Sequence, residues 1–415
     1  MNSVWKTIDL RKRIPLLCAV LFGIIFCILL VRMMTGKPYK PFDNDAAAYS
    51  AGAKNISELG LYSFDGISPT DEREPGYSFF LAPIYLLFGQ ENLPAISIIQ
   101  AGIYLLIVLL FIRELRKTQH SSVSDVTCVF LLLSPAIFRI VMTPFRESIT
   151  LSLFLLFAAF FLSFVQRPSW TKSLGMGAAM ACLILTFAPL LLFPICLIPV
   201  FIIQRLPKRF LLPVLFIPLL AASFWTIRNH SALGRYEFID PFHSASLLNT
   251  RALQVQTFKP GDSLQCLWNE YITRNMKAQK PYCYVQFVKK NDDTTRQTMR
   301  ENEGILLHAL PKFAWVALFG VIEYHLPYVG GWGHFYNIAE ALVTLLLSIG
   351  VLLSLRHIWK PFFAIFLLAM IYNIAISAVL IGLPRFRMVT FFTYAVLAGV
   401  GYGRYIAQWR RKRDE

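Results

Sequence analysis

Acidic and aromatic side chains cluster directly after the first apolar run of this sequence. Asp43 and Asp45 flank Asn44, and Tyr49 follows Asp45 by four residues in an alanine-rich stretch. Alanine favours helix, and residues four apart lie on one helix face, so Asp45 and Tyr49 are predicted to point the same way. A carboxylate held in a partly desolvated cleft can have the raised pKa and fixed position of a general base. We therefore predict Asp45 as a general base, with Tyr49 beside it.

The same acidic segment offers oxygen ligands for a divalent cation. Carboxylate and amide oxygens suit Mg²⁺ and Mn²⁺, which makes Asp43 the candidate metal ligand. The sequence contains neither GxxxxGK[ST] nor GxGxxG, so no motif for nucleotide binding is present. We expect no obligatory cofactor and leave a divalent cation, Mg²⁺ or Mn²⁺, open.

Cysteine usage separates two groups of thiols. Five of the seven cysteines lie inside apolar runs and are expected to be packing residues. Cys266 and Cys283 share a long hydrophilic segment, where a disulfide would close a loop of about 18 residues and stabilise the fold by about 3 kcal/mol in the chain-entropy model. The sequence leaves a disulfide and two free thiols equally open.

The composition excludes an ordinary soluble protein. Of 415 residues, 56% are apolar and 15% charged, whereas soluble domains have about 45–50% and 25%. The net charge of +16 would suggest nucleic-acid binding in a soluble chain. Here Lys and Arg lie mostly at the ends of apolar runs, as membrane-topology signals do. We predict an all-α, polytopic membrane protein made of one domain, residues 1–415, that binds no nucleic acid.

About ten transmembrane helices are predicted from the apolar runs. As a single helix, the run 173–204 would rise about 48 Å, more than the about 30 Å of a bilayer core. Its three prolines indicate a helix pair that turns near Pro189, so this run counts as two helices. The runs lie at residues 14–31, 92–112, 126–138, 148–165, 173–204, 210–227, 336–355, 361–384 and 388–403.

The positions of the basic residues orient these helices. Short cytoplasmic loops carry the excess of Lys and Arg, which places both termini, including the basic tail 404–415, in the cytoplasm. Two long hydrophilic segments, 33–90 and 228–333, then form outer loops. Long loops are usually functional. Their half-apolar stretches, 75–89 and 304–324, are predicted to be helices lying on the membrane surface.

Several motifs, in this order along the chain, resemble those of GT-C glycosyltransferases. The resemblance is to the branch related to dolichyl-phosphate-mannose protein mannosyltransferases and bacterial lipid A aminoarabinose transferases. Glu74 and Ser78 depart from the pattern, since the family more often has Arg or Pro at the first position and Pro at the second. The motifs are Asp45 with Tyr49, Gly-Leu-Tyr-Ser at 60–63, Glu-Pro-Gly-Tyr-Ser-Phe-Phe-Leu-Ala at 74–82, Thr-Pro-Phe-Arg-Glu at 143–147, Trp-Thr-Ile-Arg-Asn-His at 225–230 and Arg-Phe-Arg-Met at 385–388.

The resemblance implies a GT-C fold and a transferase activity. Such enzymes take a sugar from a polyprenyl-phosphate carrier and give it to an acceptor hydroxyl at the outer membrane face, usually with inversion. Asp45 would deprotonate the acceptor as the sugar passes through an oxocarbenium-like state. Glu147 would orient the acceptor, help to hold a cation, or pair with Arg146. The implied enzyme is a hexosyl- or pentosyltransferase, with residues 33–90 as its catalytic loop.

The leaving group in this reaction is a lipid phosphate, which guanidinium groups bind well. Arg228, Arg385 and Arg387 are the candidate phosphate ligands, each at the outer end of an apolar run. In the first outer loop, Tyr49, Arg73 and Tyr77 complete the candidate substrate-binding residues.

The expected partners are a polyprenyl-phosphate sugar, the lipid bilayer, and a glycolipid, glycan or protein acceptor. The expected location is a bacterial cytoplasmic membrane, with the active site facing the periplasm. Two alternatives stay open, a polyprenyl-linked polysaccharide polymerase or ligase and a secondary transporter. The first would place its main loop late in the chain, and the second predicts inverted repeats and charges at mid-membrane depth.

Overall fold

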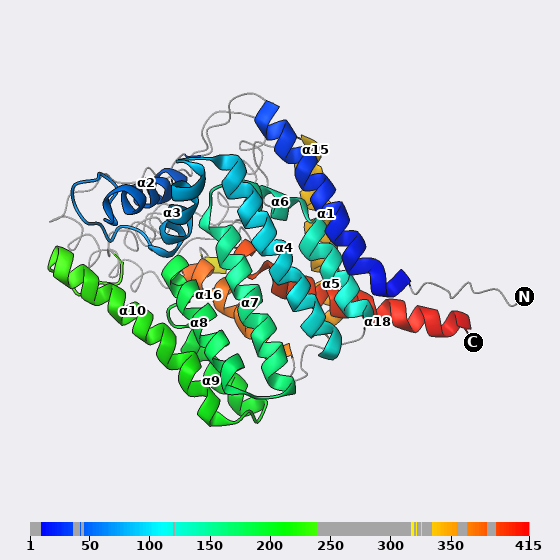
Figure 1. Cartoon of the computed structure of the whole chain (residues 1–415). Coiled ribbons are helices and arrows are strands. Elements are labelled where there is room, and N and C mark those ends of the chain that lie inside the picture. The colour runs from blue at the N-terminus through cyan, green and yellow to red at the C-terminus, as the bar shows by residue number, and fades with distance from the viewer. Residues whose placement is uncertain are drawn as a thin grey trace, which may run out of the picture.

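The structure is a computed structural model, and every regular element in its described part is a helix. Figure 1 shows long helices packed into a bundle, with the short helices α2 and α3 together at one edge. The described residues are 10–35, 42, 45–118, 121–239, 317–318, 321, 325, 334–355, 363–379 and 387–414.

Five helices in the described residues are long and apolar enough to cross a membrane. A sixth candidate is the pair α5 (Ser121–Leu133) and α6 (Pro135–Met142), bent by 49° where Pro135 has no N–H to continue the helix. This confirms a multi-pass membrane architecture, while the total of about ten spans stays a prediction. The five helices are α1 (Leu10–Thr35), α4 (Leu93–Thr118), α7 (Arg146–Gln166), α10 (Leu211–Leu233) and α15 (His334–Ser354).

The predicted turn near Pro189 is confirmed. Helix α8 (Trp170–Thr186) ends before a short 3-10 helix, η1 (Ala188–Leu190), and α9 (Phe193–Ile203) follows. Pro189 and Pro194 cannot donate backbone hydrogen bonds, which favours the break between α8 and α9 at this place. Helix α9 has 11 residues and rises about 16 Å, less than the about 30 Å thickness of a bilayer core.

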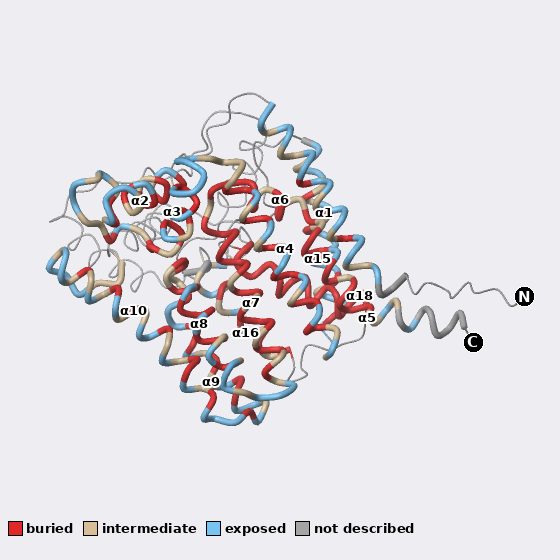
Figure 2. The backbone as a smooth tube through the Cα atoms, viewed as in Figure 1, coloured by how far each residue is buried: buried red, intermediate tan, exposed pale blue. Residues whose placement is uncertain are grey.

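Glycines allow two helices of the bundle to pack closely. The last long helix, α18 (Phe391–Asp414), packs against α5 and α15. A Cβ added at Gly399 would lie 2.7 Å from the Val123 carbonyl oxygen, and one at Gly403 would lie 2.7 Å from the Val123 nitrogen. The spacing of these glycines is that of a GxxxG motif, and it lets α18 and α5 touch closely. In Figure 2, the buried residues follow the centre of the bundle and the exposed residues follow its outside.

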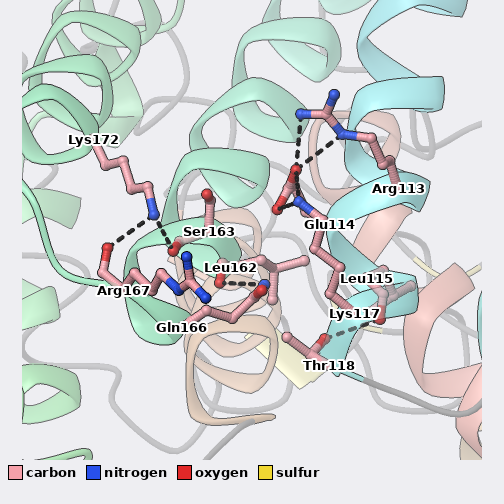
Figure 3. Close-up of polar contacts among 10 residues, drawn as sticks. All are labelled: Arg113, Glu114, Leu115, Lys117, Thr118, Leu162, Ser163, Gln166, Arg167 and Lys172. Atoms are coloured by element: carbon pink, nitrogen blue, oxygen red, sulfur yellow. Dashed lines mark hydrogen bonds and ion pairs between the residues drawn. The ribbon is translucent and has the colours of Figure 1, made fainter.

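Polar contacts gather where α4, α7 and α8 meet at one end of the bundle (Figure 3). Glu114 accepts hydrogen bonds from Arg113 at 3.0 Å and from Lys117 at 2.7 Å. Lys172 at the start of α8 donates to the carbonyls of Ser163 at 2.7 Å and Arg167 at 2.8 Å, where α7 ends. Cations at a helix C-terminus offset the helix dipole. The sequence predicts these basic segments to be cytoplasmic.

The predicted helix at 75–89 is confirmed as α3 (Gly76–Phe88), which packs against α2 (Asp45–Leu59). At the start of α3, a Cβ added to Gly76 would lie 2.7 Å from the Leu185 carbonyl oxygen. Only glycine allows α3 to approach the end of α8 this closely. The remaining short helices are α16 (Ala364–Val379) and the 3-10 helices η2 (Lys208–Phe210) and η4 (Met388–Thr390), and most of the predicted helix at 304–324 lies outside the described residues.

Candidate active site

Asp45 and Arg73 form an ion pair at the edge of the bundle. The distance between Asp45 Oδ1 and Arg73 Nη2 is 2.9 Å, and each side chain is 21% exposed. Asp45 is the first residue of α2, where a negative charge is favoured by the helix dipole, and Ala46 to Ala48 favour continuation of the helix. The predicted helix with Asp45 and Tyr49 on one face is therefore present. The pair fixes the position of the Asp45 carboxylate and leaves it open to a ligand.

Glu74 is a buried carboxylate directly beside this pair. Its side chain is ion-paired with Arg146 at the start of α7. Its Oε1 accepts a hydrogen bond from the Ala188 nitrogen at 3.1 Å, and its Oε2 accepts one from the Tyr49 hydroxyl at 3.5 Å. Burial raises the pKa of Tyr49 well above its ordinary value, so this hydroxyl stays a donor. Glu74 thus joins the loop before α3 to α2, α7 and η1.

Arg146 contacts two aromatic rings in addition to Glu74. Its guanidinium lies 4.9 Å from the ring centre of Phe187 and 5.9 Å from that of Tyr49. Cation–π contacts of this kind add to the ion pair with Glu74 when the cation is desolvated. Glu147, the next residue, is also buried in the first turn of α7.

Arg228, near the end of α10, contacts the segment that is predicted to be the first outer loop. Its guanidinium donates to the carbonyl oxygens of Thr70 at 2.8 Å and Tyr62 at 3.1 Å, and it lies 4.8 Å from the ring centre of Trp225. The helix ends at Gly234, whose φ of 73° is a left-handed conformation that glycine adopts without strain. Arg228 therefore fastens the loop, and its predicted role as a phosphate ligand stays a prediction.

Tyr62 connects Arg228 to the Asp45–Arg73 ion pair, because it is hydrogen-bonded to both arginines. Its hydroxyl donates to the Arg73 carbonyl oxygen at 3.0 Å, and its ring packs edge-on against Trp225 at 5.4 Å. Burial raises the pKa of Tyr62, which keeps the hydroxyl protonated. The backbone of Arg73 is consequently linked through Tyr62 to Trp225 and Arg228 of α10.

Tyr77, in the first turn of α3, has a fully buried side chain. Its hydroxyl donates to Gln100 Oε1 at 2.8 Å, and Gln100 Nε2 donates to the carbonyls of Val141 and Thr143 at 3.1 Å each. The Tyr77 ring meets the Tyr49 ring edge-on at 5.4 Å. Tyr77 thus links α3 to α4 and to the end of α6.

Arg387 belongs to a second buried network. It donates to the His325 carbonyl at 3.0 Å, to Thr344 Oγ1 at 3.2 Å and to Glu340 Oε1 at 3.4 Å. Glu340 Oε2 accepts a hydrogen bond at 3.1 Å from the Ala136 nitrogen, at the start of α6. These contacts are with α6, α15 and the segment before α15, and they engage both Nη atoms of Arg387 within the protein.

Four predicted site residues lie outside the described residues: Asp43, Arg385, Cys266 and Cys283. Within the described part of the chain, no group of three or more His, Cys, Asp or Glu side chains is placed to hold a metal ion. Asp45, which could share a cation with Asp43, has Arg73 as its neighbour. The metal and disulfide predictions therefore stay predictions.

Sequence reasoning did not find the roles of Glu74, Tyr62 and Glu340. The signal for Glu74 was its departure from the family pattern, directly beside the candidate Arg73. The signal for Glu340 was a lone acid that interrupts an apolar run, since such a charge needs a buried partner. Neither signal indicates which residue pairs with Glu74 or with Glu340.

Comparisons with known proteins place this architecture in a fold class. No protein-family model matches the chain, and no curated protein sequence matches it. The archaeal oligosaccharyltransferase AglB from Archaeoglobus fulgidus, in complex with an inhibitory peptide and a dolichol-phosphate, is similar with a TM-score of 0.53 at 10% identity. The match covers 99% of this chain and 52% of that chain. The apo oligosaccharyltransferase from Archaeoglobus fulgidus gives a TM-score of 0.51 at 11% identity, covering 95% and 51%.

A third similar structure is ArnT from Cupriavidus metallidurans bound to undecaprenyl phosphate. It has a TM-score of 0.42 at 16% identity, and the match covers 93% of this chain and 77% of that chain. The chain spans about half the length of the archaeal oligosaccharyltransferases. Their similarity shows that this chain has the fold of the archaeal oligosaccharyltransferases, which agrees with the GT-C fold predicted from the motifs.

Proposed function

We propose that this chain is a membrane glycosyltransferase that moves a sugar from a polyprenyl-phosphate donor to an acceptor hydroxyl. The observation that carries the proposal is the Asp45–Arg73 pair, 2.9 Å apart and partly exposed beside the buried Glu74 and Arg146. A carboxylate and a guanidinium at one place provide a base for the hydroxyl and a cation for the phosphate. The fold and the dolichol-phosphate in the AglB structure support a lipid-phosphate donor.

The reaction is a single displacement at the anomeric carbon. The acceptor oxygen forms a bond to that carbon, its proton passes to the Asp45 carboxylate, and the bond between the anomeric carbon and the phosphate oxygen breaks. The electron pair leaves with the polyprenyl phosphate, and the anomeric configuration inverts. General-base catalysis of this kind contributes about 10²–10⁴ in rate.

Arg73 is the proposed ligand of the departing phosphate, because its guanidinium already lies beside the base. Planar guanidinium donors match phosphate oxygens in pairs. Arg228, Arg385 and Arg387 are further proposed phosphate ligands. Tyr49 and Tyr77 have buried rings and internally bonded hydroxyls, so we propose that they form the floor of the site. Glu147, buried beside Arg146, is the proposed second acid that orients the acceptor.

The acceptor is proposed to be a hydroxyl of a glycolipid, an envelope glycan or a protein, and the sugar a hexose or a pentose. The proposed location is the bacterial cytoplasmic membrane, with the site facing the periplasm. This mechanism uses only residues of the chain. Transfer assays with and without a chelator, Mg²⁺ or Mn²⁺ test the candidate metal ligand Asp43.

Transfer of labelled sugar in membranes tests the proposal. Synthetic polyprenyl-phosphate sugars serve as donors and the host glycolipid fraction serves as acceptor. We expect Asp45→Asn to lower kcat by about 10²–10⁴ at matched expression. Glu72→Gln, which removes an exposed carboxylate from the same loop, is the matched control and should transfer normally. Normal transfer by Asp45→Asn would refute Asp45 as the base, and no transfer by the wild type with any donor would refute the activity.

A further inference from the structure

Glu74 is a buried charge that the proposed reaction does not use. Its side chain is 2% exposed, and removing a carboxylate from water is strongly unfavourable unless it is paired and hydrogen-bonded. The contacts of Glu74 with other parts of the fold therefore have to stabilise its carboxylate.

Both carboxylate oxygens of Glu74 are occupied by different parts of the fold. Oε2 contacts Arg146 from α7 and the Tyr49 hydroxyl from α2. Oε1 accepts from the Ala188 nitrogen at 3.1 Å, where η1 begins. One side chain thus joins three elements that are far apart in the sequence.

These contacts fix both members of the Asp45–Arg73 pair. Tyr49 is one helical turn after Asp45, so a bond to Tyr49 sets the rotation of α2. Arg73 is covalently next to Glu74, and the Tyr62 hydroxyl holds the Arg73 carbonyl at 3.0 Å. A movement of Glu74 would consequently displace the base through Tyr49 and the cation through the peptide bond.

The Glu74–Arg146 ion pair also affects which of the two arginines, Arg73 or Arg146, can bind an anion. Arg146 is buried, and Glu74 neutralises it. Arg73 lies nearer the surface, and its carboxylate partner Asp45 is equally exposed, so a phosphate can compete for Arg73. Neutralising Arg146 therefore favours binding of the donor phosphate at Arg73.

We propose that Glu74 and Arg146 form the positioning pair of the active site. They hold Asp45 and Arg73 at the separation that the reaction needs, and they direct the donor phosphate to Arg73. This inference rests on the proposed transferase function. Neither residue touches the reacting atoms, so both act through Asp45 and Arg73.

The experiment compares four variants, one of them Glu74→Asp, in the same transfer assay. Glu74→Gln removes one charge and leaves Arg146 buried without its carboxylate, which can prevent folding. The double variant Glu74→Gln/Arg146→Met removes both charges, keeps a hydrogen-bond acceptor at position 74 and places an apolar side chain of similar length at position 146, and replacing a buried ion pair by well-packed apolar groups is often neutral. The control is Arg116→Gln/Asp125→Asn, which removes another interhelical ion pair, between α4 and α5.

We expect the Glu74/Arg146 double variant to keep the apparent Tm of the wild type and to lose at least tenfold in kcat, with a donor KM within threefold. The single variant Glu74→Asp keeps the negative charge on a side chain that is shorter by one methylene group. Its kcat should therefore lie between that of the double variant and that of the wild type. The Arg116/Asp125 control should retain the wild-type kcat. A structural role alone would lower the apparent Tm and the amount of active enzyme and leave the kcat of the folded fraction unchanged.

Full kcat in the double variant would overturn the inference. So would a loss of kcat that is matched in the Arg116/Asp125 control. Failure of the proposed function looks different: wild type transfers nothing, or Asp45→Asn transfers normally. When wild type is active and Asp45→Asn is not, the Glu74 variants test the positioning pair alone.

Discussion

Replacing Gly76 by alanine tests whether the close contact between α3 and α8 sets the position of the active site. The added Cβ would lie 2.6 Å from Thr186 Oγ1 and 2.7 Å from the Leu185 carbonyl oxygen. Ordinary contacts begin at 3.4 Å, so the start of α3 must move by about 0.7 Å from the α8 backbone. Gly76 follows Arg73 and Glu74 by only a few residues, and this displacement would reach both.

The expected loss of stability in Gly76→Ala is the difference between two opposing effects. Overpacking costs about 1–3 kcal/mol, and the higher helix propensity of alanine returns up to about 1 kcal/mol. We therefore expect Gly76→Ala to be less stable by about 1–2 kcal/mol, with an apparent Tm about 1–2 °C lower. Since a displacement of about 1 Å can cost 10²-fold in rate, kcat should fall by about tenfold.

Thermal unfolding in detergent and the sugar-transfer assay measure the two effects. Gly102→Ala is the matched control, because Gly102 is also helical and no heavy atom lies within 4 Å of its added Cβ. It should keep the wild-type kcat and an equal or higher Tm. Adding Thr186→Ala to Gly76→Ala should restore only part of the loss, because the Leu185 carbonyl remains. A Gly76→Ala protein with wild-type Tm and kcat would refute the reasoning.

Three further predictions follow from other contacts. Glu340→Gln leaves Arg387 buried without its carboxylate, so it should destabilise the fold by about 3–5 kcal/mol, and a wild-type Tm would contradict this. Arg228→Lys loses the planar fork that reaches two loop carbonyls, so limited proteolysis should cut the segment 61–72 faster than in wild type. Burial raises the pKa of Tyr62, so the folded state holds its proton more tightly than the unfolded state, and stability should fall as pH rises above about 10. Tyr62→Phe should flatten that decline in Tm.

Local features of the fold were predictable because local residues determine them. Alanines after Asp45 favour α2, and Pro189 interrupts the apolar run between α8 and α9. The GxxxG spacing of Gly399 and Gly403 is typical of close helix packing, and α18 does approach α5 at these residues. Each of these predictions needs only a few consecutive residues.

The partners of the charged residues were not predictable in the same way. Glu74 contacts Arg146 and Ala188, 72 and 114 residues away, and no period or motif connects such positions. An arginine at the end of an apolar run has the same sequence signature whether it binds a phosphate or a buried carboxylate. Arg387 contacts the buried Glu340 across 47 residues, a partner that its place in the sequence did not indicate.

The packing of α18 against α5 has a consequence for biosynthesis. Helix α5 is synthesised before α18, and its partner surface around Gly399 and Gly403 is made only after the described helices that lie between the two in the sequence. Until then, the buried face of α5 with Ser124 and Thr127 has no α18 to cover it. The contact between α5 and α18 therefore forms only after the chain has been synthesised as far as Gly403, and a truncation before Gly399 leaves this face of α5 without its partner helix.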